Sequence, residues 1–342
     1  MKTDLKSLSA AELRKWIGDL GLEAFRASQI RQWLYKKMAG SFDAMTNISI
    51  SLREILKENA FISGLEKVDL LVSKDTTEKY LFRLSDGNLI ESVLIPEKDH
   101  FTLCISSQAG CAMGCTFCHT ARQGFKRNLT PAEIVDQVIE IKRSMKEPDR
   151  LTNLVLMGMG EPLANYDAVI TALDNIISED ALNFSRRKVT LSTSGLVPLI
   201  KKLGKDSPVN LAVSLNAADD ETRNRLMPVN RKYNLKSLIE ACREFPLPNR
   251  RMITFEYILI GGINDSTRDA LSLVKLLKGL RAKINLIPMN PGPDPSMKPP
   301  SFHEILNFQD ILAENKLTAI IRKSKGQDIM AACGQLSASR GQ

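Results

Sequence analysis

The stretch Cys111-Ala112-Met113-Gly114-Cys115-Thr116-Phe117-Cys118 decides the fold, and it follows a strand-like run at Thr102–Ser106. Soft thiolate ligands favour iron–sulfur clusters or zinc. An ordinary electron-transfer cubane takes four cysteines, so three leave one iron open to a further ligand, as catalytic metal sites do. The spacing therefore predicts a [4Fe–4S] cluster held by Cys111, Cys115 and Cys118.

Two other readings of this stretch remain open. Cys115-Thr-Phe-Cys118-His119 matches the attachment pattern of c-type haem, but that chemistry needs an exported chain and leaves Cys111 without a role. A zinc site built from the three cysteines and His119 would place two adjacent residues in one tetrahedron, at an unusual spacing. His119 is most simply a polar residue beside the cluster.

Outward from the cysteines, the chain alternates between strand-like and helical runs. The expected strands are Thr102–Ser106, Asn153–Met157, Lys188–Ser192, Asn210–Leu215, Ile253–Leu259 and Lys283–Ile287. The expected helices between them are Pro131–Ser144, Asp167–Ile177, Leu196–Leu203, Leu235–Glu244 and Thr267–Leu277. Six such units imply parallel strands with right-handed crossovers, in an open partial barrel or a doubly wound sheet. Either fold places its site at the carboxyl ends of the strands.

Residues 1–95 show a different pattern and predict a small α+β accessory domain. Helical spacing appears at Ala11–Leu20, Ala27–Met38 and Ser51–Glu58, and strand-like runs follow at Lys67–Val72, Tyr80–Leu84 and Leu89–Ile95. We expect residues 96–300 to form the α/β core. Residues 301–342 form a short C-terminal extension, with a helix and a strand at Thr318–Lys323.

Composition favours a soluble, ordinary globular protein. The chain has 342 residues, 43% of them hydrophobic and 25% charged, and a net charge of +8. Its start is charged where a signal peptide needs an apolar run, and no stretch is long enough to span a membrane. We therefore expect a cytoplasmic protein, in which six cysteines indicate metal binding or catalysis. The basic charge suits a polyanionic partner such as RNA.

The cysteine triad after the first strand resembles that of the radical-SAM superfamily, whose core is a partial (β/α)6 barrel. The resemblance implies that S-adenosylmethionine binds the open iron through its amino and carboxylate groups. An electron from the cluster then splits the sulfonium to give a 5′-deoxyadenosyl radical. The protein supplies position and a dry site for this chemistry.

The resemblance extends to the residues expected around S-adenosylmethionine. The run Met157-Gly158-Met159-Gly160-Glu161-Pro162 is similar to the superfamily's G-G-E-P stretch, in which the carboxylate holds the methionine amino group. Hydroxyl and amide groups at later strand ends are expected to bind the ribose, adenine and carboxylate. The implied cofactor residues are Gly160, Glu161, Ser192, Ser214, Leu215, Asn216 and Asn290.

Two further cysteines narrow the family. The segments Thr102–Cys111, Gln123–Leu129 and Ala331–Leu336 resemble the RlmN-type methyltransferases, which modify carbon 2 of adenine in 23S rRNA and tRNA. Cys104 and Cys333 mark this family among radical-SAM proteins, whereas we expect Cys242 to be a buried, inert thiol. The family usually has histidine where this chain has Asn216, which puts that one contact in doubt.

The resemblance implies a route through Cys333. Carbon 2 of adenine is electron-poor and cannot attack a sulfonium methyl group, so Cys333 takes the methyl group first. The radical removes a hydrogen from that methyl group, the product adds to the adenine, and Cys104 releases the RNA by attacking the Cys333 sulfur, leaving a transient disulfide. Glu91 matches the family's proposed proton acceptor, although Cys104 could take this proton.

RNA contacts and partners follow from the same resemblance. Basic residues expected near the rim of the site are Lys126, Arg127, Arg186, Arg187, Arg223, Arg225, Arg250 and Arg251. We expect an electron donor such as flavodoxin or ferredoxin and a monomeric enzyme. The alternatives are a Cfr-type enzyme that methylates carbon 8, a radical-SAM enzyme with a protein or small-molecule substrate, and a non-catalytic iron–sulfur or zinc RNA-binding protein.

Overall fold

The computed structural model of the protein describes residues 2–338. Its core is the parallel part of a ten-stranded sheet. Its parallel strands follow one another in chain order. They are β6 Phe101–Cys104, β9 Leu151–Leu156, β10 Val189–Thr193, β11 Asn210–Ser214, β12 Ile253–Leu259, β13 Ala282–Pro288 and β14 Thr318–Ile321. Strand β12, which has a parallel neighbour on each side, is buried along its whole length, as strands inside parallel sheets are.

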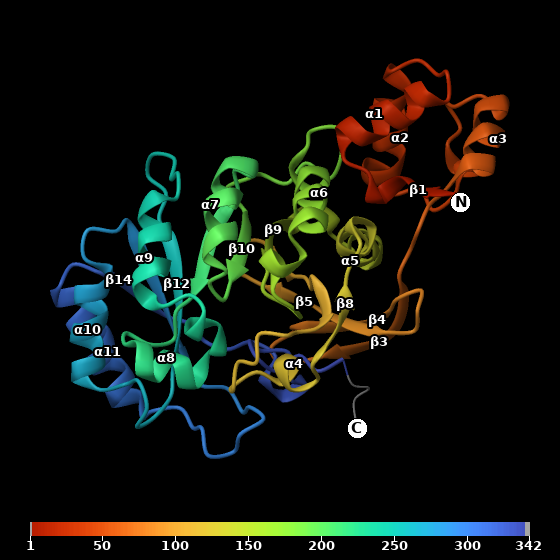
Figure 1. The fold of residues 1–342 in the computed structure, drawn as a ribbon. Coiled ribbons are helices and arrows are strands. Elements are labelled where there is room, and N and C mark those ends of the chain that lie inside the picture. The colour runs from red at the N-terminus through yellow and green to blue at the C-terminus, as the bar shows by residue number, and fades with distance from the viewer. Residues whose placement is uncertain (1, 339–342) are drawn as a thin grey trace.

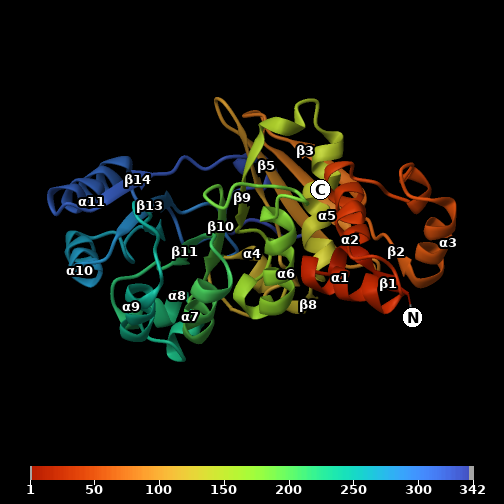
Figure 2. The same cartoon turned by 90° about the horizontal axis from the view of Figure 1, so that it is seen from above.

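The order of the strands decides between the two predicted architectures. Among residues 2–338 the order of the parallel strands never reverses, so the sheet lacks the switch point of a doubly wound fold. Right-handed crossovers then leave the connecting helices on one face, as Figures 1 and 2 show. These helices are α5 Pro131–Ser144, α6 Tyr166–Ile177, α7 Val197–Asp206, α9 Leu235–Glu244, α10 Thr267–Leu277 and α11 Phe302–Glu314. The predicted partial barrel is confirmed.

The three strands predicted for the accessory region extend this same sheet. Strands β3 (Glu66–Val72), β4 (Glu78–Arg83) and β5 (Leu89–Pro96) run antiparallel, and β5 pairs with β6. In that pairing Val93 lies opposite Cys104. The expected boundary after residue 95 therefore falls within β5, a strand that pairs with the first parallel strand of the core.

A helical unit precedes these strands. Helices α1 (Ala10–Asp19), α2 (Phe25–Arg31) and α3 (Ile50–Asn59) lie beside the core in Figure 1, tied by the short pair β1 (Thr3–Asp4) and β2 (Ala60–Phe61). None of the described helices is long and apolar enough to cross a membrane.

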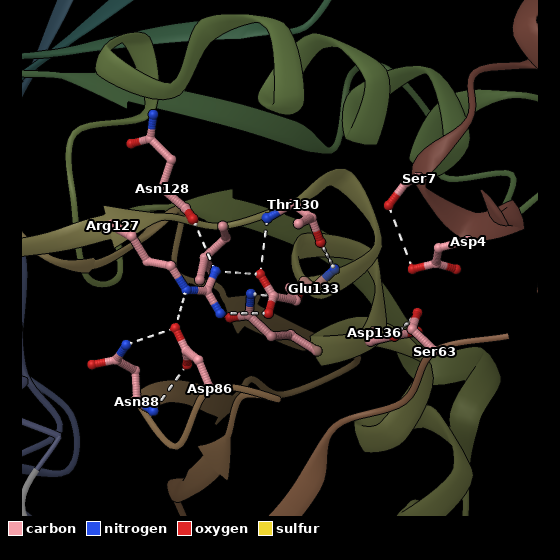
Figure 3. A network of polar contacts seen from close by, with 12 residues as sticks. Asp4, Ser7, Ser63, Asp86, Asn88, Arg127, Asn128, Thr130, Glu133 and Asp136 are labelled. Atoms are coloured by element: carbon pink, nitrogen blue, oxygen red, sulfur yellow. Dashed lines mark hydrogen bonds and ion pairs between the residues drawn. The ribbon is translucent and has the colours of Figure 1, made fainter. Parts of the chain in front are cut away.

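Buried polar contacts dock this unit on α5 and α6. Lys6 forms an ion pair with Asp136 of α5, and both side chains are 1% exposed. The Ser63 hydroxyl donates to the same carboxylate over 2.9 Å, as Figure 3 shows. Arg31 donates to Asn175 of α6 over 2.6 Å. Lys6, Ser63 and Arg31 thus each have a polar partner across the contact, although Arg31 Nη2 donates to no group among the described residues.

A small ribbon that the sequence did not predict encloses the cysteine stretch. Strands β7 (Gln108–Gly110) and β8 (Phe125–Asn128) pair antiparallel, and the short helix α4 (His119–Arg122) lies between them. Gly110 is required here because a Cβ atom would lie 1.8 Å from the Gly124 carbonyl oxygen. The ribbon thus fixes both ends of the loop that carries the cysteines.

Candidate functional site

The three cysteines lie on one half-buried loop beyond the carboxyl end of β6. Cys111 follows β7 directly and Cys118 precedes α4. Burial raises the pKa of the Cys111 thiol to about 12. Burial also raises the pKa of Cys115, with smaller effects from the charges of Cys118 and Cys111. The three thiols therefore lie within electrostatic reach of one another.

The arrangement of these thiols fits a cubane better than a single ion. Within residues 2–338, no three His, Cys, Asp or Glu side chains converge closely enough to hold one metal ion. A zinc site needs all its ligands within about 2.3 Å of one point. In a cubane each cysteine binds a different iron, so the thiolates stay apart.

An apolar wall stands beside the cysteine loop. Cys115 and Cys118 pack against a hydrophobic cluster that is separate from the main core. Its buried members are Phe117, Leu226, Met227, Ile258, Ile260, Ile287 and Met289. On the outer side, Cys115 and Arg122 border a hollow of about 300 Å³. The loop thus has a dry side toward the barrel and an open side toward solvent.

Glu161 lies at the carboxyl end of β9 and is 3% exposed. Its carboxylate accepts hydrogen bonds from the backbone N–H groups of Leu163 (3.0 Å) and Ser194 (2.7 Å). Burial raises its pKa. The preceding Gly160 has a φ of 100°, and a Cβ there would lie 2.5 Å from Gln108. Close packing of two loops therefore requires this glycine. The Glu161 carboxylate lies near enough to Cys111 and Cys115 for its charge to raise their pKa values.

Arg223 connects the carboxyl ends of β10 and β11, a structural role that the sequence did not predict. Arg223 is fully buried and donates to the carbonyl oxygens of Ser194 (2.7 Å), Ser214 (3.1 Å) and Leu215 (3.0 Å). Its fourth hydrogen bond goes to the Asn230 side chain. Burial lowers the pKa of the guanidinium to about 10, so it stays charged at neutral pH. Arg223 is thus a support for the predicted site residues at the ends of β10 and β11.

The two predicted asparagines make internal hydrogen bonds. The side-chain oxygen Oδ1 of Asn216 accepts from Ile258 N–H over 2.9 Å, and the Asn216 backbone has a φ of 58°. Asparagine tolerates this left-handed conformation better than most residues, which gives a physical reason for its presence. Asn290 donates to the Cys333 carbonyl oxygen over 3.2 Å. It therefore links the end of β13 to the segment that carries Cys333.

Cys104, at the end of β6, and Cys333, near the end of the chain, lie within electrostatic reach of each other. Burial raises the pKa of Cys104, and the charge of Cys333 raises it further. Residue Cys333 is exposed, yet the protein around its thiol removes water from it. This desolvation, followed by the charge of Glu256, raises the pKa of Cys333 to about 11. Both thiols are free, and both are protonated at neutral pH unless a bound cation lowers these pKa values.

Glu91 of β5 is completely buried below the Cys333 segment. One carboxylate oxygen accepts from the Ser337 N–H over 2.8 Å. The other lies 3.1 Å from Lys79 Nζ but accepts no well-directed hydrogen bond. Lys79 in turn lies 3.4 Å from the Met330 carbonyl oxygen. The carboxylate thus supports the C-terminal segment and keeps acceptor capacity on one oxygen.

The basic residues predicted near the rim of the site differ in place and in surroundings. Arg127 is held between Asp86 and Glu133, as Figure 3 shows, and Arg223 is buried, so neither is free to bind RNA. Arg186, Arg187, Arg250 and Arg251 precede β10 and β12, at the amino ends of the strands, whereas the cysteines lie at the carboxyl ends. Lys126 and Arg225 remain exposed near the cysteine side.

Comparison with known proteins matches both parts of the chain. Residues 105–274 match the radical SAM superfamily, and residues 3–62 match the ribosomal RNA large subunit methyltransferase N-terminal domain. The dual-specificity RNA methyltransferase RlmN of Desulfosudis oleivorans is 54% identical over 98% of this chain and 91% of its own. That of Syntrophus aciditrophicus is 52% identical over 98% and 97%. A radical SAM methyltransferase from Sphaerobacter thermophilus superposes with a TM-score of 0.92, at 44% identity over 98% of this chain and all of that one.

Proposed function

The chain belongs to the RlmN family of radical-SAM RNA methyltransferases, and we propose that it methylates carbon 2 of an adenine in 23S rRNA and tRNA. The observation that carries this proposal is that Cys104 and Cys333 lie within electrostatic reach of each other, and that Cys333 lies within such reach of Cys118. A radical-SAM enzyme that acts on a protein or a small molecule has no need of this second pair of thiols.

The cofactors of the family are a [4Fe–4S] cluster and S-adenosylmethionine. When bound, they supply an electron, a methyl group and a radical that abstracts hydrogen. We propose Cys111, Cys115 and Cys118 as the cluster ligands, supported by their loop and by the apolar wall beside it. That wall keeps water away from reactive species formed in the barrel.

For S-adenosylmethionine we propose a site along the strand ends. The Glu161 carboxylate would hold the cationic amino group, since burial strengthens its attraction for a positive charge. The other proposed contacts are Gly160, Ser192, Ser214, Leu215, Asn216 and Asn290. Arg223 supports this proposal, because it ties the ends of β10 and β11 into one rigid rim.

In the proposed reaction Cys333 carries the carbon and Cys104 resolves the product. The Cys333 thiolate gains a methyl group by displacement and then loses one hydrogen atom from it. The remaining methylene radical would join carbon 2 of the adenine. The adduct would then return one electron to the bound cluster, and Glu91 would accept the proton that carbon 2 loses. Cys104 would attack the Cys333 sulfur, so the carbon–sulfur bond breaks, the released carbon takes up a proton to become the methyl group, and a disulfide forms between the two cysteines. The proposed electron donor would reduce this disulfide before the next turnover.

Binding of the partners is also proposed. The exposed Phe125 and Lys126 of β8 lie next to the cysteine loop and suit an unstacked base and its phosphate. The hollow lined by Cys115 and Arg122 offers an electron donor a short approach to the cluster. We propose that the enzyme acts as a cytoplasmic monomer.

Anaerobic reconstitution tests the proposal. Protein loaded with iron and sulfide would be mixed with a reductant, S-adenosylmethionine and rRNA fragments. We expect 5′-deoxyadenosine and 2-methyladenosine, identified by mass spectrometry against C2 and C8 standards. 8-Methyladenosine would instead identify the Cfr-type reaction.

Two cysteine variants separate the roles of the thiols. Cys104→Ala should accumulate RNA crosslinked to Cys333, because the adduct forms but cannot be released. Cys242→Ala is the matched control, since Cys242 is a buried cysteine outside the proposed site, and it should give free methylated RNA. Normal turnover by Cys333→Ala would exclude the proposed route.

A further inference from the structure

Four arginines surround a cavity at the end of the barrel opposite the cysteines. Arg186, Arg187, Arg250 and Arg251 line a space of about 370 Å³. The first two precede β10, and the second two precede β12, so the cavity opens at the amino ends of the strands. The proposed reaction uses none of these residues.

The positive charges in this arginine cavity have no internal counterion. None of the ion pairs formed within residues 2–338 includes any of the four, and no carboxylate lines the cavity. Burial and the charges of Arg186 and Arg187 together lower the pKa of Arg251. Grouped like charges destabilise the folded protein, and a bound anion would remove this cost.

The walls of the cavity are held in place by the backbone. Arg251 donates to the Pro208 carbonyl oxygen over 2.8 Å, and Asn210 donates to the Arg187 carbonyl oxygen over 2.9 Å. Arg250 has a φ of 65°, a strained conformation for arginine. The loop before β12 is thus fixed against the starts of β10 and β11, with its arginines around a shared space.

Guanidinium groups in this arrangement match phosphate. Each presents a planar fork of donors that binds phosphate oxygens in pairs. A cavity with several such groups suits a chain of phosphates better than one carboxylate side chain. We propose that the arginine cavity is a second RNA site, which binds backbone phosphates of the substrate RNA away from the methylated adenine. This inference rests on the proposed RNA methyltransferase function.

The distance between the two sites sets the size of the RNA. Strand β12 has 7 residues, and at about 3.3 Å per residue it separates the ends of the barrel by about 23 Å. A stem-loop whose stem is shorter than this distance does not reach the cavity when its loop is bound at the cysteines. A larger folded RNA does reach it. An acidic electron donor bound at the cavity would lie at the wrong end of the barrel to reduce the cluster.

The test compares two RNAs and two matched triple variants. The cavity variant carries Arg186→Gln, Arg187→Gln and Arg250→Gln. It loses three charges from the cavity and keeps the hydrogen bond from Arg251 to the Pro208 carbonyl oxygen. The control carries Lys236→Gln, Arg268→Gln and Lys278→Gln, which remove three exposed charges elsewhere. Binding of cluster-loaded protein to a long rRNA fragment and to a short stem-loop would be measured over a range of salt concentrations.

We expect the cavity variant to bind the long RNA at least ten-fold more weakly, and the slope of log Kd against log salt to fall by about 2–3. Binding of the stem-loop and its kcat should stay at the wild-type values. A variant with lysine at the same three positions should recover most of the wild-type salt dependence of Kd, because lysine also carries a positive charge.

Three results would overturn the inference. The first is unchanged affinity for the long RNA, and the second is an equal loss of affinity for both RNAs. The third is inorganic phosphate binding that the cavity variant abolishes while its RNA binding stays intact, which would indicate a site for a free anion. Binding is measured without turnover, so a failure of the proposed methylation would not be mistaken for a failure of the cavity.

Discussion

Arg223 offers a sharp test of how the strand ends are held. Its replacement by methionine keeps an unbranched side chain of similar length and removes every hydrogen-bond donor. Three carbonyl groups, those of Ser194, Ser214 and Leu215, then lose their partner inside the protein. We expect this variant to be clearly less stable than the wild type.

The magnitude follows from two opposing terms. Four hydrogen bonds from a charged donor, at about 1.5–3 kcal/mol each, amount to about 6–12 kcal/mol. Removal of a buried guanidinium recovers several kcal/mol of its desolvation cost, so the net loss should be about 2–5 kcal/mol. The hydrogen bonds dominate because the three carbonyl groups stay buried in the variant.

Urea unfolding of the reduced, cluster-free protein, followed by circular dichroism, measures this loss. Arg225→Met is the matched control, since Arg225 is exposed and lies two residues after Arg223 in the same helix, α8 (Asp220–Leu226). Its free energy of unfolding should stay within about 0.5 kcal/mol of the wild type. If both variants unfolded at the same urea concentration, the hydrogen bonds of Arg223 would not be what holds the strand ends.

Other predictions concern the docking of the helical unit, the reactive thiol and a crowded glycine. Asp136→Asn should cost about 3–5 kcal/mol of unfolding free energy, because Lys6 stays buried without its partner, and a double Lys6→Met, Asp136→Leu variant should recover most of it. The iodoacetamide reaction of Cys333, followed by peptide mass spectrometry, should still rise with pH above pH 9, since its pKa is raised to about 11; a plateau near the ordinary value of about 8.5 would contradict this. Gly160→Ala should lower thermal stability more than Gly262→Ala, because a Cβ meets another side chain only at the first position.

Much of the fold could be predicted from local patterns. The run Ile253–Leu259 is rich in β-branched and aromatic residues and predicts a strand, and it forms a buried one. Thr130, Pro131 and Glu133 predict the start of α5, and the capping box forms there. These signals are local because each depends on residues within one or two turns of the chain.

Features that depend on distant partners were harder to predict. The pairing of β5 with β6 joins the two predicted domains, and no pattern in Leu89–Ile95 reveals which strand it will meet. Arg127 and Arg223 look like surface cations in the sequence. Their partners Asp86 and Ser194 lie 41 and 29 residues away along the chain, so these pairings appear only in the fold.

Strand β6 is bonded to β5 on one side and to β9 on the other. A chimaera or a truncated barrel that began at residue 96 would leave one whole edge of β6 bare. Bare strand edges recruit other chains and promote aggregation. Cys104 lies on this strand, so the same cut would open a shielded thiol to oxidation. Attempts to transplant the catalytic barrel should therefore carry β3–β5 with it as an inseparable flank.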